Sequence, residues 1–347
     1  QYITWENLSL PGICMKTASE IELVNPATGE KFKKVSYYSL EDTKSKLSLA
    51  RKIQQQWKST SLSYRIGLVK NAMDYFRANK ESISRDITLM IGKPISQSRD
   101  EVEGMIQRSD IVCRLSENAL QDILLPKLEG YNRFIRREPL GVVLDIAAWN
   151  YPLLIAVNVV VPAILSGNAV AIKHSSLTPL CALHFEDAFK KAGAPEGLVT
   201  ALILDHRTTE LIIQSGLVDH VAFTGSVDGG KRISQSTSHQ MIDVGLELGG
   251  KDPAYVREDA DLESTIPSIM DGVFYNAGQS CCAVERIYVH HSLLEAFIEG
   301  AIQYMNGLKM GDPLDDITEM GPLAQELGIK TIEEQLKDAL NNGAKII

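Results

Sequence analysis

The feature that most constrains the fold of this chain is an alternation of short apolar runs with longer helical runs between residues 141 and 248. The apolar runs have the length of single strands, and helix-like runs such as Pro179–Ala192 separate them. The strand-like runs are Gly141–Ala148, Asn168–Lys173, Leu198–Leu204, His220–Phe223 and Met241–Leu248. This pattern predicts an α/β fold with a parallel sheet covered by helices on both faces, which binds ligands at the carboxyl ends of its strands.

The chain before this region is predicted to be helical over residues 40–120. Pro94, which follows Gly92, marks a break between two later helices. One face of the first helix carries apolar residues at three- and four-residue spacing, namely Leu47, Ala50, Ile53 and Trp57.

Residues 121–140 have a different pattern. Two segments, Ile123–Pro126 and Arg133–Arg137, flank Glu129-Gly130 in a pattern that predicts a β-hairpin. The hairpin either projects from the body or is a pair of surface loops, and the pattern favours neither. At the other end, the residues from Gly343 onward are expected to form a turn that opens into an apolar strand.

Composition excludes several classes of function. The formal net charge of −9 argues against nucleic-acid and acidic-membrane partners, which favour basic faces. The longest apolar stretch, Leu153–Leu165, is too short to span a bilayer and is expected to be a buried helix. Five scattered cysteines without metal-ligand spacing indicate a reducing compartment such as the cytoplasm, with neither a disulfide framework nor a metal site.

The first strand of the alternation is followed directly by Trp149 and Asn150, and Pro152 suits the first turn of the helix after them. The Asn150 side chain can be a helix N-cap or an amide donor that faces a developing oxyanion. Spacing alone favours neither interpretation.

Two other strand ends carry residues suited to a nucleotide. Lys173 can reach a ribose or a phosphate, although exposure to solvent is the commoner state of a lysine, and His174 is expected at the surface. Phe223-Thr224-Gly225-Ser226, followed by Gly229-Gly230 and a helix, allows close backbone approach to an anion at a helix N-terminus. Because this is not G-x-G-x-x-G, a plain strand–helix turn is the alternative.

A carboxylate and a thiol complete the candidate site. Glu247 lies between two leucines and precedes two glycines. If it is partly buried, its pKa rises and it can act as a general base; the alternative is an edge-strand glutamate that faces water. The pair Cys281-Cys282 follows Gly-Gln-Ser in a polar loop, which fits a reactive thiolate better than a small buried apolar residue.

Together these motifs resemble the aldehyde dehydrogenase superfamily in order and in spacing. The matching motifs are W-N-Y-P-L, A-I-K-H-S, F-T-G-S, L-E-L-G-G-K and F-x-N-x-G-Q-x-C, with N-P-A-T-G-E at Asn25–Glu30. The resemblance implies a Rossmann-like NAD(P)-binding domain at residues 1–120 and 141–249, an oligomerisation hairpin at 121–140 and a second α/β catalytic domain at 250–347. Family members continue well beyond this point, so we expect a C-terminally truncated chain whose catalytic domain is incomplete and whose activity alone is impaired.

The resemblance also implies a role for each residue. Cys281 is the nucleophile and Cys282 a bystander, Glu247 is the general base, and Asn150 stabilises the oxyanion together with the backbone N–H of Cys281. The cofactor-binding residues that it implies are Trp149, Lys173, Ser176, Gly225, Ser226 and Gly230. The implied reaction is oxidation of an aldehyde to a carboxylic acid with NAD or NADP, through a thiohemiacetal and a thioester. Glu247 favours hydrolysis of that thioester over transfer to coenzyme A.

One residue departs from the family pattern. Many NAD-preferring relatives carry a glutamate three residues after the lysine, where this chain has Ser176. A hydroxyl can hydrogen-bond to a 2′-phosphate that a carboxylate would repel, so we hypothesise that NADP is accepted alongside NAD. The resemblance further implies a small aldehyde substrate and a homodimer or homotetramer, and Tyr151, Leu154 and Phe274 suggest an apolar substrate funnel.

Two other classes of function are possible on the same fold. A cofactor-free thiol hydrolase would use Cys281 but would have no use for Lys173 or the Phe223–Ser226 loop. A non-catalytic scaffold would need none of Cys281, Glu247 and Asn150. No packing argument requires all three, so their presence weighs against this class.

Overall fold

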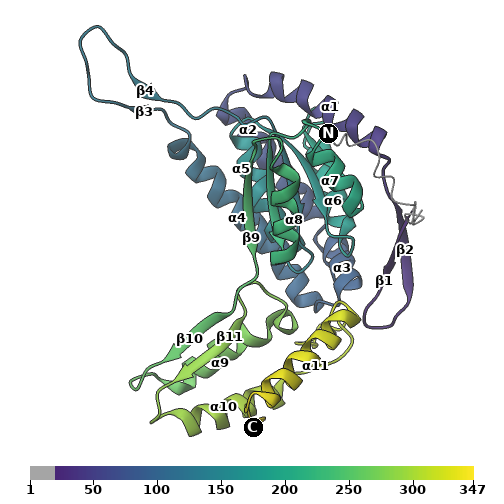
Figure 1. Cartoon of the computed structure of the whole chain (residues 1–347), viewed down its shortest axis with the longest axis vertical. Helices are drawn as coiled ribbons and strands as arrows, with labels where there is room; N and C mark the ends of the chain where they lie inside the picture. Colours follow the sequence, from purple (N-terminus) through teal and green to yellow (C-terminus); the bar gives the residue numbers. More distant parts are fainter. Residues whose placement is uncertain (1–19) are drawn as a thin grey trace, which may run out of the picture.

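The structure is a computed structural model that describes residues 20–347, so Cys14 lies outside the described residues. Its centre is a five-stranded sheet in the order β7-β6-β5-β8-β9, with every neighbouring pair parallel (Figure 1). The strands are β5 (Val142–Ala147), β6 (Ala169–His174), β7 (Val199–Ala201), β8 (His220–Gly225) and β9 (Asp243–Leu248). All five predicted strands are therefore confirmed, and so is the α/β fold.

Helices cover both faces of this sheet. On one face, α5 (Pro152–Leu165) packs on β5 and β6, and α6 (Pro179–Lys191) packs on β6 and β7. On the other face, α1 (Leu40–Trp57) and α8 (Val227–Thr237) lie on either side of α7 (His206–Ile213). Because β5 and β6 are buried at every position, their sequences are almost continuously apolar.

The helical region before the sheet is also confirmed. It continues with α2 (Leu62–Ala78), α3 (Lys80–Ile91) and α4 (Ile95–Ala119), which pack outside α5 and α6. Gly92 ends α3 in the left-handed conformation, at a φ of 74°, and Pro94 precedes α4. On α1, Leu47, Ala50 and Trp57 are buried as the spacing predicted, and Ile53 is half-buried.

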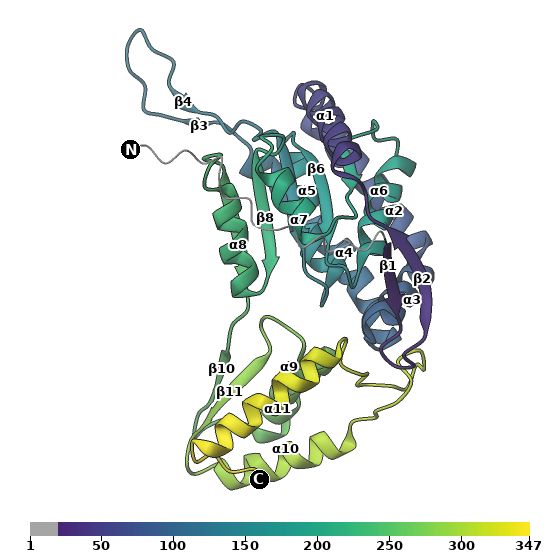
Figure 2. The same cartoon turned by 45° about the vertical axis from the view of Figure 1, so that its right-hand side comes forward.

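Two hairpins extend from this body. The strands β1 (Glu20–Val24) and β2 (Lys31–Ser36) are antiparallel and are joined by a turn at Asn25–Glu30. The strands β3 (Ile123–Leu124) and β4 (Phe134–Ile135) form the predicted hairpin, which projects far from the body in both views (Figure 2).

A smaller unit follows β9 and lies beyond the end of the sheet (Figure 2). It contains the parallel strands β10 (Asp252–Val256) and β11 (Val284–Val289), and the helices α9 (Leu262–Phe274), α10 (Leu294–Gly307) and α11 (Glu326–Asn341). A small apolar cluster of its own, which includes Val256, Ile266, Met270 and Phe297, stabilises it.

The strand expected after Gly343 is wrong. Residues 344–347 have no regular structure, because no strand of the described residues pairs with them. The helix predicted at Leu153–Leu165 is confirmed as the buried α5. Among residues 20–347, every helix is too short or too polar to cross a membrane.

Candidate active site

The predicted site residues gather at one edge of the sheet, because the carboxyl ends of parallel strands lie on the same side. Asn150 follows β5, Lys173 is the last residue but one of β6, and Gly225 ends β8. Glu247 pairs with Thr224 in the register of β8 and β9, so it lies beside the turn at Gly225. Half-buried Trp149 packs against the main core at the same edge.

The loop that carries the two cysteines is folded back onto this edge by a strained turn. In the short helix η2 (Tyr275–Gly278), Asn276 and Ala277 have positive φ values of 53° and 55°. Such values are uncommon outside glycine and persist only where the surroundings hold them. Here the backbone N–H of Asn276 donates to Gln97 Oε1 at 3.0 Å, and Gln279 Nε2 donates to the Asn276 carbonyl at 3.0 Å.

The Asn150 amide is fixed between this loop and the start of α5. Its Nδ2 donates to the carbonyl of Gln279 at 3.1 Å, and its Oδ1 accepts from the N–H of Tyr151 at 3.2 Å. Asn276 Nδ2 bridges the carbonyls of Asn150 and Gln279 at 3.2 and 3.3 Å. Among residues 20–347, the second N–H of the Asn150 amide has no hydrogen-bond partner. The helix N-cap interpretation of Asn150 is wrong, because Tyr151 is the N-cap of α5.

Cys281 is exposed two residues beyond the carbonyl that Asn150 contacts. A Cβ built on Gly250 would lie 3.5 Å from the Cys281 carbonyl oxygen, so the loop after β9 and the cysteine loop are in contact. Partial burial, the Cys282 thiol and the charge of Glu247 together raise the pKa of the Cys281 thiol. The structure thus brings Asn150, Cys281 and Glu247 to one place.

The burial that we considered for Glu247 is not found. Glu247 is exposed on β9, which is an edge strand of the sheet, as in the alternative of a glutamate that faces water. The exposure follows from its position, because no further strand of the described residues covers this edge. Its charge nevertheless acts on the Cys281 thiol.

The expected exposure of Lys173 and His174 is wrong for both. Only 5% of Lys173 is accessible, and burial lowers its pKa to about 8, with a partial offset from the Asp205 carboxylate. His174 is 3% accessible, and its Nε2–H donates to the Pro152 carbonyl at 2.9 Å. Burial lowers the pKa of His174 to about 4, so the ring is neutral at physiological pH. Both lie in a fully buried strand, which the apolar run before them did not reveal.

The glycines after β8 fit the start of α8 closely. A Cβ on Gly225 would lie 2.6 Å from the Phe223 ring, and one on Gly230 would lie 2.9 Å from Leu248. Ser226 is the N-cap of α8, and its Oγ accepts from the N–H of Gly229 at 3.1 Å. Exposed Ser176 lies in the turn after β6. A helix N-terminus after β8, and a buried lysine and a hydroxyl at the end of β6 on the other side of β5, fit the phosphates and ribose of a dinucleotide.

Some residues at the site were not identified by the sequence. Asn276 belongs to the F-x-N motif, but nothing in its spacing indicated that it joins Asn150 to the cysteine loop. Lys93 and Glu101 form a buried ion pair beneath the turn at Tyr151, and only the packing of α4 on α5 brings them there. The three residues suggested for a funnel do not share one cluster: Leu154 packs on the main core and Phe274 on the small one.

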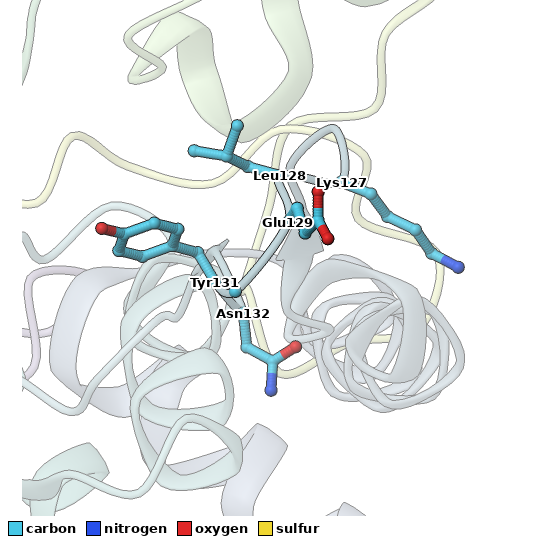
Figure 3. A pocket seen from close by; sticks show the side chains of 6 residues that line it. Lys127, Leu128, Glu129, Tyr131 and Asn132 are labelled. Carbon is cyan, nitrogen blue, oxygen red and sulfur yellow. The ribbon is translucent and has the colours of Figure 1, made fainter.

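A hollow in the surface lies away from this edge, at the tip of the β3–β4 hairpin (Figure 3). Six consecutive residues, 127–132, line it, and Lys127 and Tyr131 extend away from each other. A hollow inside a single loop has no opposing wall to enclose a small molecule. We therefore place the site at the sheet edge.

The fold and the site fit the class of dinucleotide-dependent oxidoreductases, with the exposed Cys281 thiol near the carboxyl edge of the parallel sheet. Comparison with known proteins identifies the family, because residues 14–347 match the model of the aldehyde dehydrogenase family and the chain belongs to it. The chain is an NAD(P)-dependent aldehyde dehydrogenase, which oxidises an aldehyde with NAD or NADP.

Its relatives come from distant organisms. Succinate-semialdehyde dehydrogenase [NADP(+)] of Mycolicibacterium paratuberculosis is 31% identical over 331 residues, which are 94% of this chain and 70% of that protein. The mitochondrial succinate-semialdehyde dehydrogenase of Oryza sativa is 30% identical, over 94% of this chain and 62% of that protein. A structure of betaine aldehyde dehydrogenase from Staphylococcus aureus with NAD+ has a TM-score of 0.89 at 28% identity, over 94% of this chain and 65% of that one.

Proposed function

We propose that Cys281 is the nucleophile of this aldehyde dehydrogenase, that Asn150 stabilises the oxyanion and that Glu247 activates water. The observation that carries this proposal is the contact between the Asn150 amide and the backbone of the Cys281 loop, at 3.1 Å from Nδ2 to the Gln279 carbonyl. Hydrogen bonds at both Nδ2 and Oδ1 hold the Asn150 amide in place, so it needs little reorganisation when charge develops on the substrate.

The reaction begins at the thiol. Cys281 attacks the aldehyde carbon, the carbonyl oxygen becomes the oxyanion of a thiohemiacetal, and the free N–H of Asn150 and the backbone N–H of Cys281 donate to it. Removal of one such donor costs about 3–4 kcal/mol of barrier. NAD(P)+ held at Lys173, Ser176 and the start of α8 would supply the hydride acceptor for this carbon, and a thioester would then remain on Cys281.

Glu247 then releases the product. Its carboxylate takes a proton from water, the hydroxide adds to the thioester carbon, and the Cys281 thiolate leaves as the carboxylic acid forms. The proximity of Glu247 to Cys281, which its effect on the thiol pKa reflects, supports this role. The pKa of Cys281 itself is raised, so the thiol must pass its proton to Glu247 or to water as it attacks, and Glu247 returns a proton taken in this way to solvent before it activates water.

For the cofactor, we infer that Lys173 and Ser176 hold the adenosine ribose and that Gly225, Ser226 and Gly230 hold the pyrophosphate at the start of α8. Trp149 lines the same edge. The exposed hydroxyl of Ser176, three residues after Lys173, supports acceptance of a 2′-phosphate, and the relative from Mycolicibacterium is named for NADP.

The organisation of the whole protein is a further part of the proposal. Residues 1–120 and 141–249 form the cofactor-binding domain, and residues 250–347 belong to the catalytic domain; the separate apolar clusters support this division. The exposed apolar hairpin, with Leu124 81% accessible, supports a homodimer or homotetramer. Unpaired Cys113, Cys181, Cys281 and Cys282 fit a cytoplasmic protein.

A matched pair of variants tests the chemistry. The intact protein is assayed for NADH and NADPH formation with small aldehydes, including succinate semialdehyde and betaine aldehyde. Cys281→Ser should abolish turnover, whereas Cys282→Ser should retain it within a few-fold. Loss of turnover in Cys282→Ser with Cys281→Ser active would overturn the assignment.

A further inference from the structure

A buried ion pair lies directly beneath the turn that carries Asn150. Lys93, in the bend between α3 and α4, contacts Glu101 of α4 at 2.5 Å from Nζ to Oε2, and their side chains are 0% and 1% accessible. It is the only ion pair within residues 20–347 with both side chains fully buried. A buried pair is weak support for stability, because desolvation of both charges offsets their attraction. Stability of the fold therefore does not account for this ion pair, and we looked for a role at the site above it.

Glu101 holds the first turn of α5. Its Oε1 accepts from the N–H of Leu153 at 2.8 Å and, more weakly, from the N–H of Leu154 at 3.4 Å. The first N–H groups of a helix have no partner within the helix, and Tyr151 supplies no side-chain cap for them. The Glu101 carboxylate of α4 thus takes the place of the missing cap, and its negative charge interacts favourably with the positive end of the α5 helix dipole.

Lys93 holds the other part of the same turn. Its Nζ lies 4.0 Å from the centre of the Tyr151 ring, within the range of a cation–π contact. A second neighbour of that ring is Tyr275, whose ring is nearly parallel to it at 6.4 Å between centres. Tyr275 begins the turn that carries Asn276 and leads to Cys281.

We propose that Lys93 and Glu101 are positioning residues that fix the Asn150 amide against the cysteine loop. Glu101 fixes the residues after Asn150, and Lys93 fixes the Tyr151 ring, which also contacts Tyr275 at the start of the cysteine loop. Neither residue touches the substrate. The inference depends on the proposed role of Asn150 as the oxyanion donor.

The test compares Lys93→Met and Glu101→Gln in the intact protein. Methionine keeps the length of the side chain without its charge, and the amide oxygen of glutamine can still accept from α5. We expect kcat to fall about 10- to 100-fold in Lys93→Met, because displacement of a catalytic group by about 1 Å costs that much. The fall in Glu101→Gln should be smaller, because its amide oxygen can still hold the first turn of α5. The KM for the aldehyde and the Kd for the cofactor should stay within about threefold, since the pair contacts neither.

Epistasis with Asn150 separates positioning from general damage. In an Asn150→Ala background, Lys93→Met should lower kcat less than about threefold further, because the group that it positions is gone. Lys80→Met removes the partly exposed ion pair between Lys80 of α3 and Glu103 of α4, and should leave kcat unchanged. Thermal unfolding reports whether each variant is folded. The double variant Lys93→Met/Glu101→Gln leaves no unpaired buried charge, so it should fold, and its kcat should still be reduced.

The outcomes are distinct. If Asn150→Ala itself leaves kcat unchanged, the proposed oxyanion role fails, and the positioning role fails with it. If Asn150→Ala is impaired but the folded pair variants have wild-type kcat, only the positioning role fails. An equal loss from Lys93→Met in both backgrounds would also overturn it, because the pair would then act independently of Asn150.

Discussion

Replacement of Lys173 by methionine should stabilise the fold while it weakens cofactor binding. Burial lowers the pKa of Lys173 from its ordinary 10.5 to about 8. Below pH 8 the lysine is charged in both the folded and the unfolded chain, so the folded state carries the full cost of burying that charge. At 1.36 kcal/mol for each pH unit, the difference amounts to about 3 kcal/mol. Methionine has a similar length and no charge, so at pH 7 Lys173→Met should gain most of this free energy of unfolding.

The stability difference between Lys173→Met and the wild type should depend on pH. Between pH 8 and 10.5 the unfolded chain binds more protons at Lys173 than the folded chain does, so the stability of the wild type rises with pH over this interval. The advantage of Lys173→Met should therefore shrink from about 3 kcal/mol at pH 7 to near zero by about pH 10.5.

Urea unfolding at several pH values measures this difference, with exposed Lys52→Met on α1 as the control that should change little. Binding of NADP, followed by isothermal titration calorimetry, should weaken in Lys173→Met. A variant that is less stable than the wild type at pH 7, or whose advantage does not change with pH, would refute the reasoning.

Three other substitutions follow from the same structure. His174→Gln should reduce the loss of stability at acid pH. Burial lowers the pKa of His174 from 6.5 to about 4, so the wild type loses about 3 kcal/mol of unfolding free energy as pH falls from 6.5 to 4. Equal urea midpoints for both proteins across this range would contradict the prediction. Gly92→Ala should destabilise the fold by about 1–3 kcal/mol, because φ is +74° and the new Cβ would lie 2.6 Å from Pro322. Gly29→Ala has the same φ but open space around its Cβ, so it should lower the thermal unfolding temperature less. A larger loss in Gly29→Ala than in Gly92→Ala would contradict this reasoning. Ser176→Glu should lower kcat/KM for NADP far more than for NAD, and an unchanged ratio would remove Ser176 from cofactor selection.

Sequence patterns predicted the parts of this protein that depend on local periodicity. The strands from Gly141 to Leu248 are short apolar runs between helices, and this alternation is typical of a doubly covered parallel sheet. The hairpin at residues 121–140 was also predicted, but only the structure decided that it projects. The motifs placed Asn150, Lys173, Gly225 and Glu247 at strand ends, and parallel topology then brings them to one edge.

What the sequence could not predict depends on contacts between distant segments. The burial of Lys173 and His174 is set by the helices that cover β6, not by their neighbours in the chain. The exposure of Glu247 is set by the position of β9 at the sheet edge. The Lys93–Glu101 pair and the bridge made by Asn276 require α4, α5 and the cysteine loop to meet, and no spacing in the sequence encodes that meeting.

The central claim is that Cys281 carries the acyl group which Glu247 releases. The most direct measurement is mass spectrometry of Glu247→Gln after reaction with an aldehyde and NAD(P)+, together with the amount of NAD(P)H formed in the first turnover. We predict one NAD(P)H per active site, followed by slow turnover, and an acyl adduct on Cys281. Wild-type steady turnover without an adduct, or an adduct on Cys282, would contradict the account.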